Sequence, residues 1–446
     1  MKSQTKNIMR RVLAGVLCGL SILSAIGNET SSDISPVINK DSSVTFRFKD
    51  DAAEEVYLRG SFIPITVPIN TPAGVFGKSG KYEMKRIGGY WTYTTKPLES
   101  ELYTYYFEVD GERKNDPMNN LVIKDVNSYL NYFIIGNGIA DNYCDHDVPH
   151  GTVEKVWYNS SIPGMPKRRM TIYTPPQYNT NKKQSYPVLY LLHGSGGDEN
   201  AWVDAGRAIQ ILDNLIAQNE CVPMIVVMPN GIANQEAAAG ENPYSDEDVS
   251  SMNIESMFGI IEKAFIPDIV NYVDTHYRTE NKKQGRAIAG LSLGGLHTLF
   301  ITANNPDTFD YVGLFSAQTT NLMNDKKHSE RTEKIANTVN QVAELFPFLK
   351  KGKLGKKITD LASSVSDGDL SIYEDIDNKL ASQFKEPPQL YYIAVGRDDF
   401  VKKLNDDLRL KLHQGGYNFH YNETDGGHSW ENWRKYLVDF LPRLFK

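Results

Sequence analysis

The chain has 446 residues, of which 40% are hydrophobic and 23% charged, as is typical of a globular protein with two or three domains. Its formal net charge is −7, and this becomes −11 if the four basic residues among the first eleven positions leave with a leader. Such an acidic chain is not expected to bind nucleic acid or an anionic membrane surface.

Residues 1–27 are predicted to be a secretory signal peptide, because basic residues precede a short apolar run that ends in small residues. Cys18 follows the bulky Leu17, so we do not expect lipoprotein anchoring, and no other segment looks transmembrane. The protein is therefore expected to be secreted or periplasmic. Its remaining cysteines, Cys144 and Cys221, have no metal-ligand spacing and are expected to be unpaired.

Residues 28–38 are polar and serine-rich, which predicts a linker. Residues 39–136 then contain short alternating segments separated by turn residues, without helical periodicity. This pattern predicts an all-β sandwich domain. The expected strands include 44–48, 55–60, 90–94, 103–109 and 132–135.

This β region resembles the glycogen-binding type of carbohydrate-binding module, which has an immunoglobulin-like fold. The matching residues are 56–62 (Val-Tyr-Leu-Arg-Gly-Ser-Phe), 89–91 (Gly-Tyr-Trp) and 103–117. Ile-Pro-Ile stands at 63–65, where the family pattern has a tryptophan. The resemblance implies the fold, and it leaves open whether the domain binds sugar or serves as a spacer.

Residues 137–150 read as a second linker, and residues 151–446 as an α/β domain with a doubly wound, mainly parallel sheet. Residues 320–385 interrupt the alternation and are a candidate cap insertion. The expected strands are 153–158, 169–174, 188–192, 224–228, 286–289, 311–315, 390–395 and 419–421, and the expected helices are 210–219, 265–277, 296–303, 404–413 and 433–445.

Residues 290–295, Gly-Leu-Ser-Leu-Gly-Gly, stand between an apolar strand and a helix-like run. Strand, Gly-x-Ser-x-Gly and helix together are the context of a nucleophile elbow, in which small residues leave room for a sharp turn. Ser292 is therefore the candidate nucleophile. The alternative is an ordinary strand-to-helix turn with a solvated serine.

Two further motifs would supply an oxyanion hole and a base. Residues 193–197, His-Gly-Ser-Gly-Gly, follow a buried strand, and the backbone N–H of Ser195 with that of Leu293 could hold a developing oxyanion. His428 lies in the glycine-containing loop 426–430 before the last helix and can act as the base.

The third partner would be a carboxylate that orients the histidine, and two adjacent candidates, Asp398 and Asp399, follow the strand 390–395. The chain order Ser, Asp, His is that of α/β hydrolases. His150 and His193 are expected to make structural hydrogen bonds instead.

The second region resembles carbohydrate esterase family 1, within the esterase D group of α/β hydrolases. The matching motifs are 148–151, 191–197 with Glu199 and Trp202, 290–295, and 427–430 with Trp433. With the leader and the β-sandwich, the arrangement resembles bacterial xylan-associated feruloyl esterases.

The resemblance implies a serine esterase with Ser292, His428 and Asp399 as its triad, since the family acid is the fourth residue of Gly-x-x-Asp. Trp202 and Trp430 are candidate substrate contacts. No metal or organic cofactor is implied, and feruloylated or acetylated xylan is the expected partner.

Several alternatives stay open at this point. The same triad would serve an acetyl xylan esterase, and no motif reports the size of the acyl pocket. Thioester hydrolysis, as in S-formylglutathione hydrolases, fits the leader and the sugar-module-like region less well. Acyl transfer to another alcohol, as in mycolyl transferases, would require water to be kept out of the site. A glycan-binding protein with an inactive hydrolase domain is the alternative of another class. The oligomeric state is not predicted.

Overall fold

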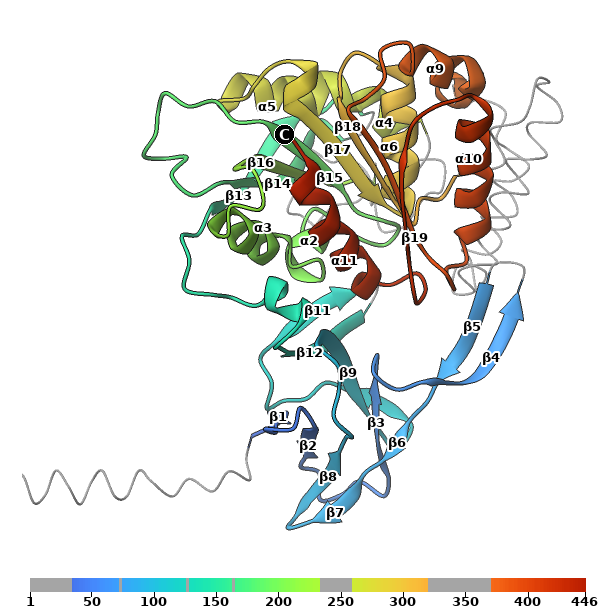
Figure 1. Cartoon of the computed structure of the whole chain (residues 1–446). Coiled ribbons are helices and arrows are strands. Elements are labelled where there is room, and N and C mark those ends of the chain that lie inside the picture. Colours follow the sequence, from blue (N-terminus) through green and yellow to red (C-terminus); the bar gives the residue numbers. More distant parts are fainter. Residues whose placement is uncertain (1–33, 72–73, 126–127, 163–164, 233–258, 320–369) are drawn as a thin grey trace, which may run out of the picture. The chain divides into compact units, whose positions relative to one another are not determined.

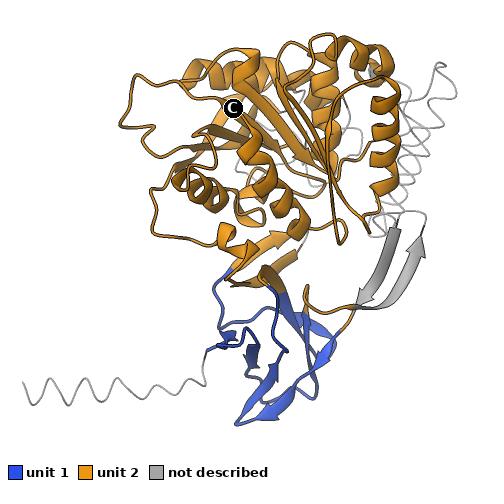
Figure 2. Cartoon of the chain, viewed as in Figure 1, with its two compact units in different colours: residues 1–59, 81–99, 105–121 blue, residues 60–80, 100–104, 122–446 orange. Residues whose placement is uncertain are grey.

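The computed structural model describes residues 34–71, 74–125, 128–162, 165–232, 259–319 and 370–446 (Figure 1). The predicted signal peptide and residues 320–369 of the candidate cap lie outside these ranges. Within them, no helix is both long and apolar enough to cross a membrane. The chain divides into two compact units (Figure 2): unit 1 is Met1–Arg59, Lys81–Glu99 and Tyr105–Leu121, and unit 2 is Gly60–Gly80, Ser100–Thr104 and Val122–Lys446.

Unit 1 is built from antiparallel strands, as the alternating sequence pattern predicts. One sheet has the order β1-β2-β8-β7; β3 pairs with β6, and β10 pairs with the end of β9. Rings from the two layers meet in the core, where Phe46 lies 4.8 Å from Tyr105 and Phe48 lies 4.9 Å from Phe107. The bounds are β1 (Val37–Ile38), β2 (Val44–Phe48), β3 (Val56–Gly60), β6 (Tyr82–Glu83), β7 (Lys85–Ile87), β8 (Tyr90–Thr94), β9 (Glu101–Val109) and β10 (Glu112–Lys114); the last residue of β3 and residues 101–104 of β9 are assigned to unit 2.

Four other strands of the expected β-sandwich region cluster with unit 2. They form two antiparallel pairs, β4 (Ile65–Thr71) with β5 (Gly74–Ser79) and β11 (Val122–Asp125) with β12 (Ser128–Ile135). The domain ranges 39–136 and 151–446 are therefore still a proposal based on the sequence pattern. They do not coincide with the two compact units.

Unit 2 contains an eight-stranded sheet in the order β13-β14-β16-β15-β17-β18-β19-β20. Only β14 runs antiparallel to its neighbours, which confirms the mainly parallel sheet. Every residue of the four central strands is buried, so both faces need helical cover. The bounds are β13 (Thr152–Asn159), β14 (Lys167–Thr174), β15 (Val188–Leu192), β16 (Ile225–Pro229), β17 (Arg286–Leu291), β18 (Tyr311–Phe315), β19 (Leu390–Gly396) and β20 (His420–Thr424).

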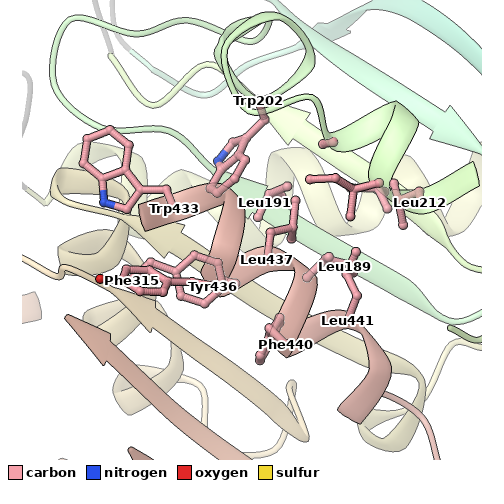
Figure 3. Packing of buried hydrophobic residues seen from close by; sticks show 14 of the residues in the cluster. Leu189, Leu191, Trp202, Leu212, Phe315, Trp433, Tyr436, Leu437, Phe440 and Leu441 are labelled. Atoms are coloured by element: carbon pink, nitrogen blue, oxygen red, sulfur yellow. The ribbon is translucent and has the colours of Figure 1, made fainter. Parts of the chain in front are cut away.

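Alternate residues of each strand face different cores. Leu189 and Leu191 of β15 pack with α2, α3 and α11, as Figure 3 shows, whereas Val188 and Tyr190 pack with the helices of the opposite face. The helices are α2 (Ala201–Asp204), α3 (Ala208–Ala217), α4 (Ile260–Ala264), α5 (Asn271–His276), α6 (Leu293–Asn304), α9 (Ile376–Gln383), α10 (Lys402–Gln414) and α11 (Trp430–Phe440), with 3₁₀ turns η2 (Ile139–Tyr143), η5 (Lys283–Gly285), η8 (Leu370–Tyr373) and η9 (Leu441–Arg443).

The helix expected at 265–277 differs from the structure. The segment starts as α4, continues as a π-helix over Phe265–Val270 and ends as α5. Pro267 lies within the π segment, and proline cannot donate an α-helical hydrogen bond, so the wider turn accommodates it. Cys144 and Cys221, which lie within the described ranges, are both free thiols, as expected.

Candidate active site

Ser292 stands at a sharp turn between β17 and α6. Its φ of 52° and ψ of −115° are rare for a residue with a side chain, and the residue is buried. The neighbouring glycines are imposed by packing: a Cβ on Gly290 would lie 2.2 Å from the Gly294 carbonyl oxygen, and one on Gly294 would lie 2.5 Å from the His193 oxygen. The strained elbow expected from residues 290–295 is therefore present.

Three of the sequence-predicted residues form one hydrogen-bonded chain. The Oγ of Ser292 lies 3.0 Å from Nε2 of His428. Nδ1 of the same ring lies 2.9 Å and 3.1 Å from the two carboxylate oxygens of Asp399. A carboxylate only accepts hydrogen bonds, so the proton belongs on Nδ1, and Nε2 is left to accept from the serine hydroxyl.

The two adjacent aspartates have different environments. The Asp399 carboxylate is fully buried and accepts the Val401 N–H at 3.0 Å, so the turn that follows β19 fixes its direction. Asp398 is exposed, and its backbone N–H donates to the Gly426 carbonyl. Asp399 is therefore the aspartate that contacts His428. The backbone of Asp398 links the turn after β19 to the loop 426–430.

The His428 ring lies between aromatic neighbours. The Phe400 ring is 4.3 Å away, and the Trp433 ring meets the imidazole at 90° with a centroid distance of 4.9 Å. The amide of Asn432 donates to the Gly427 carbonyl at 2.8 Å, which holds the loop to α11. Sequence reasoning missed Asn432 and Phe400, although both lie within four residues of a predicted site residue.

The loop 193–197 lies against the nucleophile, since a Cβ on Gly194 would come within 3.1 Å of the Ser292 Cβ. His193 fixes this loop: its Nε2 accepts the Gly231 N–H at 2.8 Å, so Nδ1 carries the proton and donates to the Gly194 carbonyl at 2.7 Å. Burial lowers the pKa of His193, which favours this neutral form. His193 therefore has the structural role expected of it.

Both expected oxyanion donors belong to segments that adjoin Ser292, namely the loop 193–197 and the start of α6. Ser195 belongs to the loop and is partly exposed. Leu293 is the first residue of α6, so its N–H has no partner within the helix and lies at the positive end of the helix dipole. Two such N–H groups suit a tetrahedral oxyanion better than a neutral carbonyl.

The two tryptophans expected to contact substrate differ in exposure. Trp202 is only 1% exposed, and its indole N–H donates to the Leu192 carbonyl at 2.9 Å, so it is available for packing and not for contact with a substrate. Trp430 is half-buried, and its ring meets Trp202 edge-on at 5.3 Å.

Two other histidines have structural partners. Nδ1 of His150 lies 3.0 Å from Asp213, and Nδ1 of the buried His297 lies 2.9 Å from Glu262. Over the ranges that the structure describes, no group of three or more histidine, cysteine or acidic side chains could hold a metal ion.

Comparison with known proteins agrees with the motifs. Residues 164–353, which include Ser292 and both expected oxyanion donors, match the family model described as Putative esterase. The chain is 30% identical over 295 residues to an endo-1,4-beta-xylanase/feruloyl esterase of Xylanibacter ruminicola, a match covering 64% of this chain and 36% of that protein. It is 25% identical over 265 residues to an acetyl esterase of Caldicellulosiruptor saccharolyticus, covering 59% and 85% respectively.

Among solved structures, the enterobactin esterase FES of Shigella flexneri aligns with a TM-score of 0.52 and 15% identity, covering 90% of this chain and 92% of that one. This likeness supports the fold alone. The chain spans little more than a third of the Xylanibacter protein, whose name combines two activities. The expected resemblance to carbohydrate esterase family 1 is confirmed by the match to the esterase family model and to the xylanase/feruloyl esterase.

Proposed function

We propose that this chain, whose α/β domain belongs to the esterase family of α/β hydrolases, is a secreted serine esterase that acts on xylan. It would release ferulate or related hydroxycinnamates from the polysaccharide side chains. The observation that carries the proposal is the hydrogen-bonded series Ser292, His428 and Asp399 beside the glycine-rich loop. The substrate class is supported by the similarity to the xylanase/feruloyl esterase.

In the proposed mechanism, the Ser292 oxygen attacks the ester carbonyl while His428 Nε2 takes the hydroxyl proton. The imidazolium that forms is stabilised by the buried carboxylate of Asp399. The N–H groups of Ser195 and Leu293 hold the oxyanion, each contributing roughly 3 kcal/mol to the transition state.

Collapse of this intermediate breaks the bond to the sugar oxygen, which leaves with the proton from His428. The acyl group stays on Ser292 as an ester. Water then loses a proton to the same Nε2 and attacks, so a free carboxylic acid and the original serine are regenerated.

Acetyl xylan esterase is the second candidate. It is favoured by the similarity to the acetyl esterase, most of whose length the alignment covers. Both candidates use the same triad and differ only in the space for the acyl group.

A paired assay tests the proposal: methyl ferulate and acetylated xylan are offered separately to the purified chain, with Ser292→Ala as the control. Ferulate release that depends on Ser292 supports the first candidate. Acetate release alone supports the second. Binding to xylan without turnover of either ester would favour the glycan-binding alternative.

A further inference from the structure

The side-chain amide of Asn432 bonds to the peptide that directly precedes His428. Asn432 is the third residue of α11, and helix side chains lean toward the N-terminus, so it reaches back to the loop that carries the histidine. Its Nδ2 donates to the Gly427 carbonyl at 2.8 Å. The residue is only 1% exposed, so a buried hydrogen bond fixes the peptide that joins Gly427 to His428.

A chain of hydroxyl groups sets the direction of this amide. Asn432 Oδ1 accepts the hydroxyl of Thr424, the last residue of β20, at 3.1 Å, and Thr424 Oγ1 lies 3.0 Å from the Tyr436 hydroxyl. A threonine hydroxyl has one hydrogen, so Tyr436 donates in the second bond. Tyr436 is completely buried, and burial raises the pKa of its hydroxyl, which therefore keeps its proton. With Oδ1 fixed in this way, Nδ2 is the atom that faces the Gly427 carbonyl.

Two glycines leave the space that the amide occupies. A Cβ on Gly396, the last residue of β19, would lie 2.8 Å from Asn432 Nδ2 and 2.3 Å from the Gly426 carbonyl oxygen. A Cβ on Gly426 would lie 3.3 Å from the same nitrogen, and this residue has a φ of 84°. The end of β19 and the histidine loop therefore close around the amide, and a larger side chain at either glycine would displace it.

The histidine loop is also held from the turn after β19. The Arg397 N–H donates to the Thr424 carbonyl at 2.8 Å. The Asp398 N–H donates to the Gly426 carbonyl at 2.9 Å. Both bonds join backbone to backbone, so they do not depend on side chains. The bond from Asn432 does depend on a side chain, and it acts at the residue next to the histidine.

The helix that carries Asn432 is itself fixed. Tyr436 and Phe440 of α11 pack in the hydrophobic core (Figure 3). Arg434 of the same helix donates to the Glu101 carboxylate of β9 at 2.8 Å, and both side chains of this ion pair are almost completely buried. An amide on such a helix can hold a loop in place, because moving the helix would break buried contacts elsewhere.

We propose that Asn432 is a positioning residue for His428. Its amide sets the peptide before the histidine and so keeps Nε2 at hydrogen-bonding distance from the Ser292 hydroxyl. Thr424 and Tyr436 set the direction of the amide. The inference rests on the proposed function of the serine and the histidine, and it deepens that function by assigning a residue of α11 to the reaction. Asn432 has no part in the proposed bond-making steps, so it acts through the histidine.

Kinetics with p-nitrophenyl acetate test this role in the full chain. The leaving group of this ester departs without a proton, so the residual reaction of a His428→Ala background is still measurable. Asn432→Asp is the principal variant, because it keeps the size of the side chain, loses the N–H donor and turns a carboxylate oxygen toward the Gly427 carbonyl. The matched control is Asn214→Asp, since Asn214 is a buried asparagine of α3 whose amide donates to the Cys144 carbonyl at 2.9 Å.

We expect kcat and kcat/KM of Asn432→Asp to fall together by about 10- to 100-fold, because His428 acts in both acyl-transfer steps and a small shift of a catalytic group is costly. Asn214→Asp should keep its kcat within about twofold, although both variants should lower the unfolding temperature by a similar amount. In the His428→Ala background, Asn432→Asp should change the residual rate by less than about twofold. A residue that acts through the histidine has nothing left to disturb once the imidazole is absent.

Equal losses from Asn432→Asp in the two backgrounds would overturn the proposal, because they would indicate a general structural effect. Wild-type kinetics of Asn432→Asp, expressed per folded molecule, would also overturn it. If this variant does not fold, Thr424→Val takes its place: valine keeps the shape of threonine and leaves the amide free to turn, so kcat should fall about threefold, again only when His428 is present. An unchanged kcat in that variant would count equally against the proposal.

The failure of the proposed function would look different. Wild-type hydrolysis of p-nitrophenyl acetate that does not depend on Ser292 would refute the serine mechanism itself. Hydrolysis that depends on Ser292, without release of ferulate or acetate from xylan, would refute only the proposed substrate and would leave the role of Asn432 to be decided by the two backgrounds.

Discussion

Replacing Asp399 with asparagine should be far more damaging than the same change at the adjacent Asp398. The Asp399 carboxylate is fully buried and places both oxygens within 3.1 Å of His428 Nδ1. Asparagine can still accept the Val401 N–H, so the turn should fold. It lacks the charge that stabilises the imidazolium, however, and its NH₂ group favours the wrong ring tautomer. We expect kcat/KM to fall about 10³- to 10⁴-fold, or roughly 4 to 5.5 kcal/mol.

The assay is steady-state hydrolysis of whichever ester the wild type cleaves, with thermal unfolding of each variant as the fold control. Asp398→Asn should retain activity within about twofold, because that side chain is exposed and its contact with the histidine loop is made by the backbone. Equal losses in the two variants, or a larger loss for Asp398→Asn, would refute the assignment of Asp399 as the residue that orients His428.

Three further outcomes follow from the elbow and its loop. Ser292→Gly should abolish turnover yet raise the free energy of unfolding by about 1 kcal/mol in urea titrations, because glycine adopts the positive φ without strain. Gly294→Ala should destabilise by about 1 to 3 kcal/mol in the same titrations, although this change usually stabilises a helix, since its Cβ would lie 2.5 Å from the His193 carbonyl oxygen. Because burial lowers the pKa of His193 below 6.5, the unfolded chain binds its proton first as pH falls; stability should therefore decrease below about pH 6.5, and His193→Gln should flatten that dependence.

The α/β part of the fold was readable from sequence because its strands are buried on both faces and appear as continuous apolar runs. The runs at 188–192 and 311–315 coincide with β15 and β18 residue by residue. The prediction of one α-helix over 265–277 was less accurate. Hydrophobic periodicity does not distinguish a regular α-helix from one that contains a π-helical segment around Pro267.

The nucleophile, the loop 193–197 and the loop 426–430 could also be predicted from the sequence. Each belongs to a short motif whose glycines are required by close packing or a tight turn. The choice between Asp398 and Asp399 needed the family resemblance, since both follow the same strand and only the turn decides which carboxylate is buried. Trp202 shows the limit of motif reasoning. A tryptophan near a site can stack on a substrate or fill the core, and its 1% exposure could not be inferred from its neighbours in sequence.

Contacts between distant segments were beyond any local pattern. Arg434 and Glu101 are 333 residues apart in sequence, and neither has a motif that points to the other. This ion pair matters because the loop 426–430, which carries His428, contains Gly426 and Gly427 and is not rigid by itself. The position of the loop therefore depends on α11 and on the ion pair that fixes α11. A base that must stay 3.0 Å from the nucleophile therefore depends on a strand, β9, that the triad motifs do not include.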